Sequence, residues 1–240
     1  MKSCYNKFMR RFFGEKKGNE IIILEDEFFH LKKVLRMSEG DKLIACISDD
    51  NDYYCTIKSI LKDRCICDID DIQENKSNPK KHITLFQMLP KKDYFDKIVA
   101  KSIELGVSNL YFFKSEYSAN MPLKRERLFS QIMTACKQCE RSKLISANDI
   151  LSFDKMLEKL SKFDCVIFAY EKCKEYYDFA KISSFDNIAL IIGAEGGFSE
   201  KEATQICQRK VITTSLGSRI LRCDTASLTL LTLVNYFTKN

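Results

Sequence analysis

Two loops near the C-terminal end of the chain hold the residues best suited to contact a ligand. They are residues 191–199 (IIGAEGGFS) and 215–222 (SLGSRILR), and they contain four of the 8 glycines in the protein. Glycine lets the backbone take unusual dihedral angles and lets a ligand approach it closely. The loops therefore predict a pocket lined by backbone, with an acid, Glu195, and two arginines, Arg219 and Arg222, beside it.

The loop sequences differ from the common nucleotide-binding motifs. Neither has the lysine-containing ending of a nucleoside triphosphate loop, and neither contains G-x-G-x-x-G. Both come late in the chain, whereas dinucleotide folds and classical methyltransferases place their glycine loop after the first strand. Ser199 and Glu202 have the spacing of a helix capping box, which explains them structurally. The residues alone predict a pocket but do not name its ligand.

The elements that must position these loops alternate between strand and helix. Parallel strands covered by helices on both faces follow from such alternation, and ligands bind beyond the carboxyl ends of the strands. The last helix is apolar nearly all round, which predicts burial against a second subunit or within its own domain. Strands are expected at 83–89, 109–113, 164–170, 188–192 and 211–215, and helices at 93–105, 123–139, 199–208 and 224–237.

The first part of the chain has a different pattern. Short alternating strands are expected at 20–24, 42–47, 53–60 and 64–69, with one helix near 28–35. This pattern predicts a small β-barrel domain over residues 1–73. Residues 74–82 are polar, lack periodicity and contain a proline, so they are expected to link it to an α/β domain at 83–240.

Charge is mildly basic, with a formal net charge of +6 over 240 residues. Basic clusters at 1–20 and 114–143, with aromatic residues nearby, would suit a phosphate backbone, but solvated lysines explain them equally well. The N-terminus leads into charge, and no stretch approaches the roughly 18 apolar residues of a membrane helix. We therefore expect a cytoplasmic protein with reduced thiols and no membrane contact.

The 11 cysteines are scattered and odd in number, which does not predict a disulfide framework. Cys136 and Cys139 form a C-x-x-C pair, but a zinc site needs further ligands, and the two histidines are far away in sequence. We expect these cysteines to act as small apolar residues and expect no metal site.

Several motifs together resemble one known family. Residues 192–199 and 216–226 are similar to the paired signature of the RsmE family, SPOUT-class methyltransferases that modify N3 of a uridine in 16S ribosomal RNA. The resemblance extends in order along nearly the whole chain. Further similar segments are 30–41, which looks like the family's PUA-like RNA-binding domain, and 89–92, 101–107, 115–118 and 138–141.

Three positions depart from the family pattern. Ala194 and Ser218 stand where the family usually has proline, and the segment 223–225 reads Cys-Asp-Thr in place of Thr-Glu-Thr. The first two changes alter loop stiffness more than chemistry. Asp224 keeps the charge of the usual glutamate with a shorter reach.

The resemblance implies an α/β fold in which a mostly parallel sheet carries a C-terminal SPOUT-type trefoil knot, joined to a small PUA-like β-barrel domain. It implies S-adenosylmethionine as methyl donor, a homodimer, and 16S ribosomal RNA of the small ribosomal subunit as partner. The cofactor-binding residues that it implies are Ala169, Ile192, Gly193, Ala194, Glu195, Gly196, Gly197, Leu216, Gly217, Ile220, Leu221 and Arg222.

The resemblance also leads to hypotheses about catalysis. Arg222, or Arg141 from the facing subunit, would stabilise the uracil anion that develops during methylation. Glu195 would orient the donor or the base, or would fix its own loop by binding backbone amides. The RNA-binding residues expected are Arg10, Arg11, Arg36, Lys91, Lys92 and Arg141.

Two alternatives stay open at this point. One is a ribosomal RNA-binding or assembly factor that keeps the fold without catalysis. The other is a SPOUT enzyme that acts on a different RNA.

Overall fold

A computed structural model describes residues 9–147 and 149–239 and divides them into two compact units. One unit holds the chain up to Asn78 together with Cys136–Leu144, and the other holds Pro79–Ala135 together with the chain from Ile145. The division at 78/79 falls inside the expected linker, but the sequence did not indicate that Cys136–Leu144 belongs to the first unit. A segment that is distant in sequence joins a domain through tertiary contacts, and a local sequence pattern does not reveal these.

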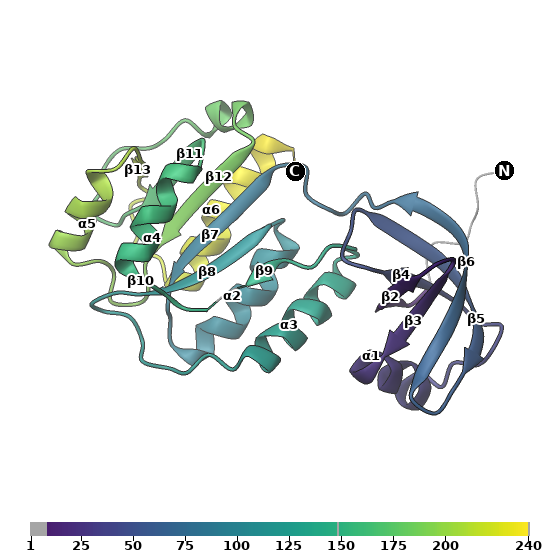
Figure 1. The fold of residues 1–240 in the computed structure, drawn as a ribbon. Helices are drawn as coiled ribbons and strands as arrows, with labels where there is room; N and C mark the ends of the chain where they lie inside the picture. Colours follow the sequence, from purple (N-terminus) through teal and green to yellow (C-terminus); the bar gives the residue numbers. More distant parts are fainter. Residues whose placement is uncertain (1–8, 148, 240) are drawn as a thin grey trace. The chain divides into compact units, whose positions relative to one another are not determined.

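The first unit is built on a curled sheet of six strands in the order β1-β4-β5-β6-β3-β2 (Figure 1). Only β1 and β4 are parallel. Two register shifts along the β5–β6 pair interrupt the ladder, and such bulges bend a strand and help the sheet to curl. The strands are β1 (Arg11–Phe13), β2 (Glu15–Lys17), β3 (Glu20–Leu24), β4 (Lys42–Cys46), β5 (Asn51–Ile60) and β6 (Arg64–Glu74).

Alternation along these strands places one row of side chains in the core. Ile21 and Ile23 of β3 and Cys65 and Cys67 of β6 are fully buried, as period-two patterning requires. The expected helix near 28–35 begins earlier, as α1 (Glu25–Phe29), and continues as a π-helical turn over His30–Val34. It closes one end of the core through Phe28 and Leu31.

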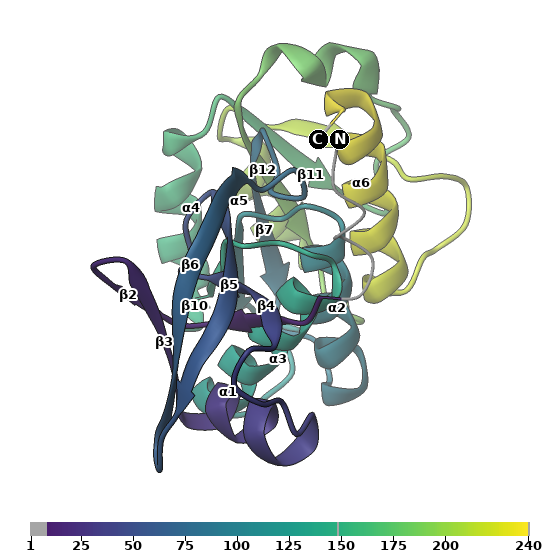
Figure 2. The same ribbon diagram turned by 90° about the vertical axis from the view of Figure 1, so that its right-hand side faces the viewer.

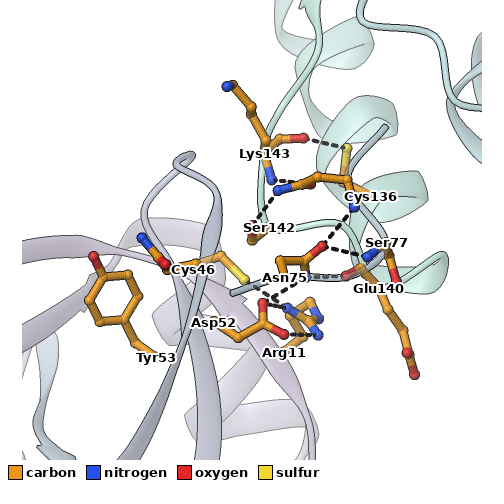
Figure 3. Close-up of polar contacts among 12 residues, drawn as sticks. Arg11, Cys46, Asp52, Tyr53, Asn75, Ser77, Cys136, Glu140, Ser142 and Lys143 are labelled. Atoms are coloured by element: carbon orange, nitrogen blue, oxygen red, sulfur yellow. Dashed lines mark hydrogen bonds and ion pairs between the residues drawn. The ribbon is translucent and has the colours of Figure 1, made fainter. Parts of the chain in front are cut away.

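A buried polar cluster inside the first unit binds the turn that follows α3 (Arg125–Gln138) (Figure 3). Arg11 and Asp52 form a bidentate ion pair. The Nδ2 atom of Asn75 donates to Asp52 Oδ1 and to the carbonyl of Glu140, at 2.8 Å each. Because these side chains are largely buried, the cluster is a specific attachment for the returning segment and not a surface contact.

The end of α3 is a Schellman motif. The Arg141 amide donates to the Cys136 carbonyl at 2.9 Å, and the Glu140 amide donates to the Lys137 carbonyl at 3.3 Å. Glu140 stands at the left-handed position of this motif, with φ of +64°, where glycine is the usual residue. The Asn75 contact helps to hold a residue that pays a steric cost for this conformation.

The second unit contains a fully parallel sheet in the order β10-β8-β7-β12-β11-β13, with β9 beside β8. The strand–helix alternation of the sequence predicted this arrangement. The short strands β9 and β10 were not predicted. The strands are β7 (His82–Met88), β8 (Asn109–Lys114), β9 (Ser146–Ala147), β10 (Leu151–Ser152), β11 (Cys165–Ala169), β12 (Asn187–Ile192) and β13 (Ile212–Thr214).

Helices cover both faces of this sheet (Figures 1 and 2). On one face, α4 (Phe153–Lys159) and α5 (Glu200–Cys207) pack on side chains such as Phe86 and Phe168. On the other face, α2 (Lys92–Glu104) and α6 (Cys223–Thr238) pack against each other. Neither α4 nor the 3-10 helix at Phe179–Ser184 was predicted.

The C-terminal helix α6 buries one face within its own unit. Leu230, Leu231 and Val234 are fully buried, whereas Tyr236 is 76% exposed. One face of α6 is therefore buried inside its own domain, as one of the two predictions had it. Another face of the helix lies at the surface. Within residues 9–147 and 149–239, no helix combines the length and the apolar character needed to cross a bilayer.

We predict that Glu140→Gly stabilises the protein by about 0.5–1 kcal/mol, because glycine takes the left-handed conformation without the penalty of a Cβ atom. Urea unfolding would measure the change. Glu140→Ala is the matched control, since alanine keeps the penalty and should give no gain. A loss of stability in the glycine variant would contradict the assigned turn geometry.

Candidate functional site

A pocket with a cavity volume of about 110 Å³, open to solvent, lies in the second unit at the carboxyl ends of β11, β12 and β13. Parallel strands bring their carboxyl ends to one edge of the sheet, so three loops meet there. The pocket combines apolar side chains with loop backbone. Its lining residues are Ala169, Tyr170, Glu171, Ile192, Gly193, Ala194, Gly197, Ser215, Leu216, Gly217, Ser218, Arg219, Ile220, Leu221, Cys223 and Ala226.

Two glycines of the first loop are required by their surroundings. A Cβ atom on Gly196 would lie 2.7 Å from the Cβ of Tyr117, which real side chains do not approach. Gly197 has φ of +67°, and a Cβ there would lie 2.9 Å from Oε1 of Glu171. Packing against Tyr117 therefore requires glycine at 196, and the left-handed backbone favours glycine at 197.

The side chain of Gln87 in β7 connects three parts of the site. Its Nε2 atom donates to the carbonyl of Gly193 at 2.9 Å, and its Oε1 atom accepts from the hydroxyl of Ser227 in α6 at 2.6 Å. Gln87 is fully buried. A buried amide with both ends satisfied fixes the distance between strand, loop and helix, because neither bond can be exchanged for water.

Ser199 and Glu202 form the capping box predicted at the start of α5. Glu202 does more than cap the helix, since it also accepts from the Ser115 hydroxyl at 2.5 Å and from the Glu116 amide at 2.9 Å. Burial would raise the pKa of Glu202, but these hydrogen bonds and those from Ser199 outweigh it, and the pKa is lowered. The Glu202 carboxylate thus ties the loop after β8 to the end of the first glycine loop.

Glu195 is not one of the residues that line the pocket. Its Oε1 atom accepts from the backbone amide of Lys91, which caps α2, at 3.0 Å. A carboxylate at a helix N-terminus is also favoured by the helix dipole. This contact supports the hypothesis that Glu195 fixes its loop by binding a backbone amide.

The residues expected to bind the cofactor fall into two groups. Glu195, Gly196 and Arg222 are not part of the lining. The others line the pocket: Ala169, Ile192, Gly193, Ala194, Gly197, Leu216, Gly217, Ile220 and Leu221.

Some lining residues were missed as cofactor-binding candidates. Tyr170 and Glu171 directly follow the predicted Ala169, and Cys223 and Ala226 begin the last helix. Their position at the same strand ends was the available signal. Arg219, one of the two arginines that the sequence placed at the pocket, is part of the lining.

The basic residues expected to contact RNA differ in exposure. Arg10, Arg36, Lys91 and Lys92 are exposed. The Arg11 side chain is 9% exposed and paired with Asp52. Arg141 is 3% exposed, and burial lowers the pKa of its guanidinium. Burial therefore argues against direct RNA contact by Arg11 and Arg141.

Metal ligands do not gather in the described part of the chain: among those residues, no three or more histidine, cysteine, aspartate or glutamate side chains are placed to hold an ion. Cys136 is fully buried at the end of α3 and Cys139 is half-buried.

Comparison with known families assigns both parts of the chain. Residues 76–235 match the family described as RNA methyltransferase domain, and residues 23–70 match the family described as RNA methyltransferase PUA domain. The fold and its pocket therefore define an RNA methyltransferase that carries a PUA domain. The chain belongs to the ribosomal RNA small subunit methyltransferase E family, to whose Bacillus subtilis member it is 30% identical over 96% of this chain and 98% of that protein.

Other relatives agree along the full length. The Mesomycoplasma hyopneumoniae ribosomal RNA small subunit methyltransferase E is 26% identical, covering 93% of this chain and 98% of its own. The crystal structure of the Neisseria gonorrhoeae protein of that name, bound to S-adenosyl methionine, has the same fold, with a TM-score of 0.86 at 24% identity over 95% of this chain and 98% of that one. The expected trefoil knot is consistent with this family.

We predict that Gln87→Leu destabilises the protein by about 2 kcal/mol, because the Gly193 carbonyl and the Ser227 hydroxyl lose a buried partner. Hydrogen–deuterium exchange should increase at residues 193–198 and 223–227, and urea unfolding would give the free energy. Gln208→Leu, at an exposed position, is the control. Unchanged exchange in the Gln87 variant would rule out its connecting role.

Glu202 should make stability depend on pH. Because its pKa is lower in the folded state, it stabilises the fold above its unfolded value of roughly 4.3, and that stabilisation is lost as pH falls through the folded pKa. We predict that Glu202→Gln costs about 1–2 kcal/mol at pH 7 and progressively less toward pH 3. Urea unfolding across this range would measure it, with exposed Glu200→Gln as control. A cost independent of pH would contradict the assignment.

Proposed function

We propose that this protein transfers a methyl group from S-adenosylmethionine to N3 of a uridine in 16S ribosomal RNA. The observation that carries the proposal is the backbone-lined pocket at three adjacent strand ends, in a chain that aligns over nearly its whole length with a ribosomal RNA small subunit methyltransferase E. The Neisseria gonorrhoeae relative that binds S-adenosyl methionine shares this fold.

The lining suits the proposed cofactor. Ile192, Leu216 and Leu221 offer apolar surface for an adenine ring, and the two glycine loops offer backbone donors and acceptors. Pockets that combine apolar surface with placed polar groups are typical for cofactors. When bound, S-adenosylmethionine supplies an electrophilic methyl carbon. The protein's own part is to hold it and to present a base to it.

Arg222 is the best-placed residue for the base. It is exposed and stands at the N-cap of α6, next to Cys223, which lines the pocket. As uracil N3 loses its proton, negative charge spreads onto the ring, and a guanidinium together with the positive end of a 16-residue helix favours that charge. Arg141 is buried within its own chain, so we assign this role to Arg222 alone.

The RNA would be held by cations outside the pocket. Exposed Arg10, Arg36, Lys91 and Lys92, in a chain of net charge +6, can neutralise phosphates. The target base would leave its stack to reach the methyl group. Such a reaction takes place where ribosomal RNA is found, in the cytoplasm.

We also propose that the protein acts as a homodimer. Tyr236 of α6, which is 76% exposed, and Ile220, which is 89% exposed at the pocket rim, supply apolar surface for a second copy. Burial of such residues between subunits is a common source of association free energy.

Two other functions fit less well. A binding factor without catalysis would not need to keep the exposed Arg222 beside the pocket. A methyltransferase for a different RNA would not be expected to match the small-subunit family along both domains.

We predict that the purified protein, given S-adenosylmethionine and small ribosomal subunits from a strain lacking this gene, forms N3-methyluridine in 16S RNA. Nucleoside mass spectrometry would detect it. Arg222→Ala should lower the rate about 100-fold, as loss of one charge-stabilising donor does, while cofactor affinity changes less than about twofold. Arg209→Ala, a cation outside the pocket, is the control. Methylation only at another base would refute the proposed product, and full activity of the Arg222 variant would refute the role of Arg222.

A further inference from the structure

The charges of the pocket are few. Among the described residues that line it, only Glu171 and Arg219 are charged. Both are exposed at the rim, whereas Ile192 behind them is 2% exposed. The pocket therefore has an apolar inner part and a rim with one negative and one positive group.

Neither of these charges is neutralised within the described chain. No ion pair or side-chain hydrogen bond involves the Glu171 carboxylate or the Arg219 guanidinium among those residues, while Lys172, next to Glu171, pairs with Glu200 at 3.0 Å. A carboxylate and a guanidinium left without partners at a pocket rim are available to a ligand that brings the opposite charges.

The Glu171 carboxylate lies against the first glycine loop. Its Oε1 atom lies where the Cβ of any residue other than glycine at 197 would come within 2.9 Å. The left-handed backbone at Gly197 therefore leaves room for a carboxylate directly against the loop that forms the pocket floor. Glu171 is thus an exposed residue of the pocket lining whose carboxylate lies beside the first glycine loop.

We propose that Glu171 binds the α-ammonium group of the methionine part of S-adenosylmethionine. The inference rests on the proposed function and names a residue that determines how the cofactor is held. The methionine part is a zwitterion, which the two rim charges match, and the uncharged adenosine matches the apolar inner part formed by Ile192, Leu216 and Leu221. A contact with the ammonium adds an attraction between opposite charges, which a ribose hydroxyl would not supply.

Three ligands separate this contact from the other possibilities. S-adenosylmethionine and S-adenosylhomocysteine both carry the ammonium group, but only the first carries the sulfonium charge. 5′-Methylthioadenosine keeps the adenine and ribose and lacks the amino acid. We predict that Glu171→Gln, which keeps the shape and removes the charge, weakens binding of the first two about tenfold in calorimetry. Binding of methylthioadenosine should change less than about twofold.

Glu200→Gln is the matched control, because it removes a nearby negative charge outside the pocket and should leave all three affinities unchanged. An equal loss for methylthioadenosine would overturn the proposal in favour of a ribose or purely structural role. Unchanged binding of every ligand would also overturn it. A wild-type protein that binds none of the three would instead refute the proposed function, and the role of Glu171 with it.

Discussion

The buried amide of Gln87 is the interaction on which the cofactor pocket depends. It joins the central strand β7, the carbonyl of Gly193 and the hydroxyl of Ser227, three points that are far apart in the sequence. Without that connection, the carbonyl of Gly193 and the hydroxyl of Ser227 would each lose a buried hydrogen-bond partner. A pocket that uses backbone groups for recognition needs such support, because backbone cannot change rotamer to correct a misplaced loop.

The first unit also contains buried polar side chains that are hydrogen-bonded to one another. Arg11, Asp52 and Asn75 are satisfied by one another, and Asn75 uses its remaining donor on the carbonyl of Glu140 (Figure 3). This attachment stabilises a left-handed residue in a Schellman turn that a glycine would occupy without cost. The hydrogen bond from Asn75 offsets the steric cost at Glu140 and fixes a segment from another part of the chain. Arg11 and Arg141 are therefore better explained as structural residues of this unit than as contacts for RNA.

In the pocket, the groups that provide its shape differ from the groups that carry charge. Backbone and apolar side chains provide shape, and the charges are held back to the rim, where Glu171 and Arg219 have no partners among the described residues. Glu195, the acid that the sequence placed beside the pocket, caps α2 through the Lys91 amide. Charged groups at a rim stay hydrated before a ligand arrives, so they carry little desolvation cost in the free protein. They contribute to binding once the ligand excludes water.

The sequence by itself determined the class of fold, the parallel sheet, the capping box of Ser199 and Glu202, and the loops that form the pocket. These features follow from hydrophobic periodicity and glycine spacing, which act over a few neighbouring residues. It also carried the family resemblance, which the comparisons bear out. The tertiary structure alone decided that 136–144 joins the first unit, that Arg141 is buried, and that Glu171 lines the pocket while Glu195 and Arg222 do not. Those outcomes depend on which segments pack side by side, and contacts between distant segments leave no local pattern in a single sequence.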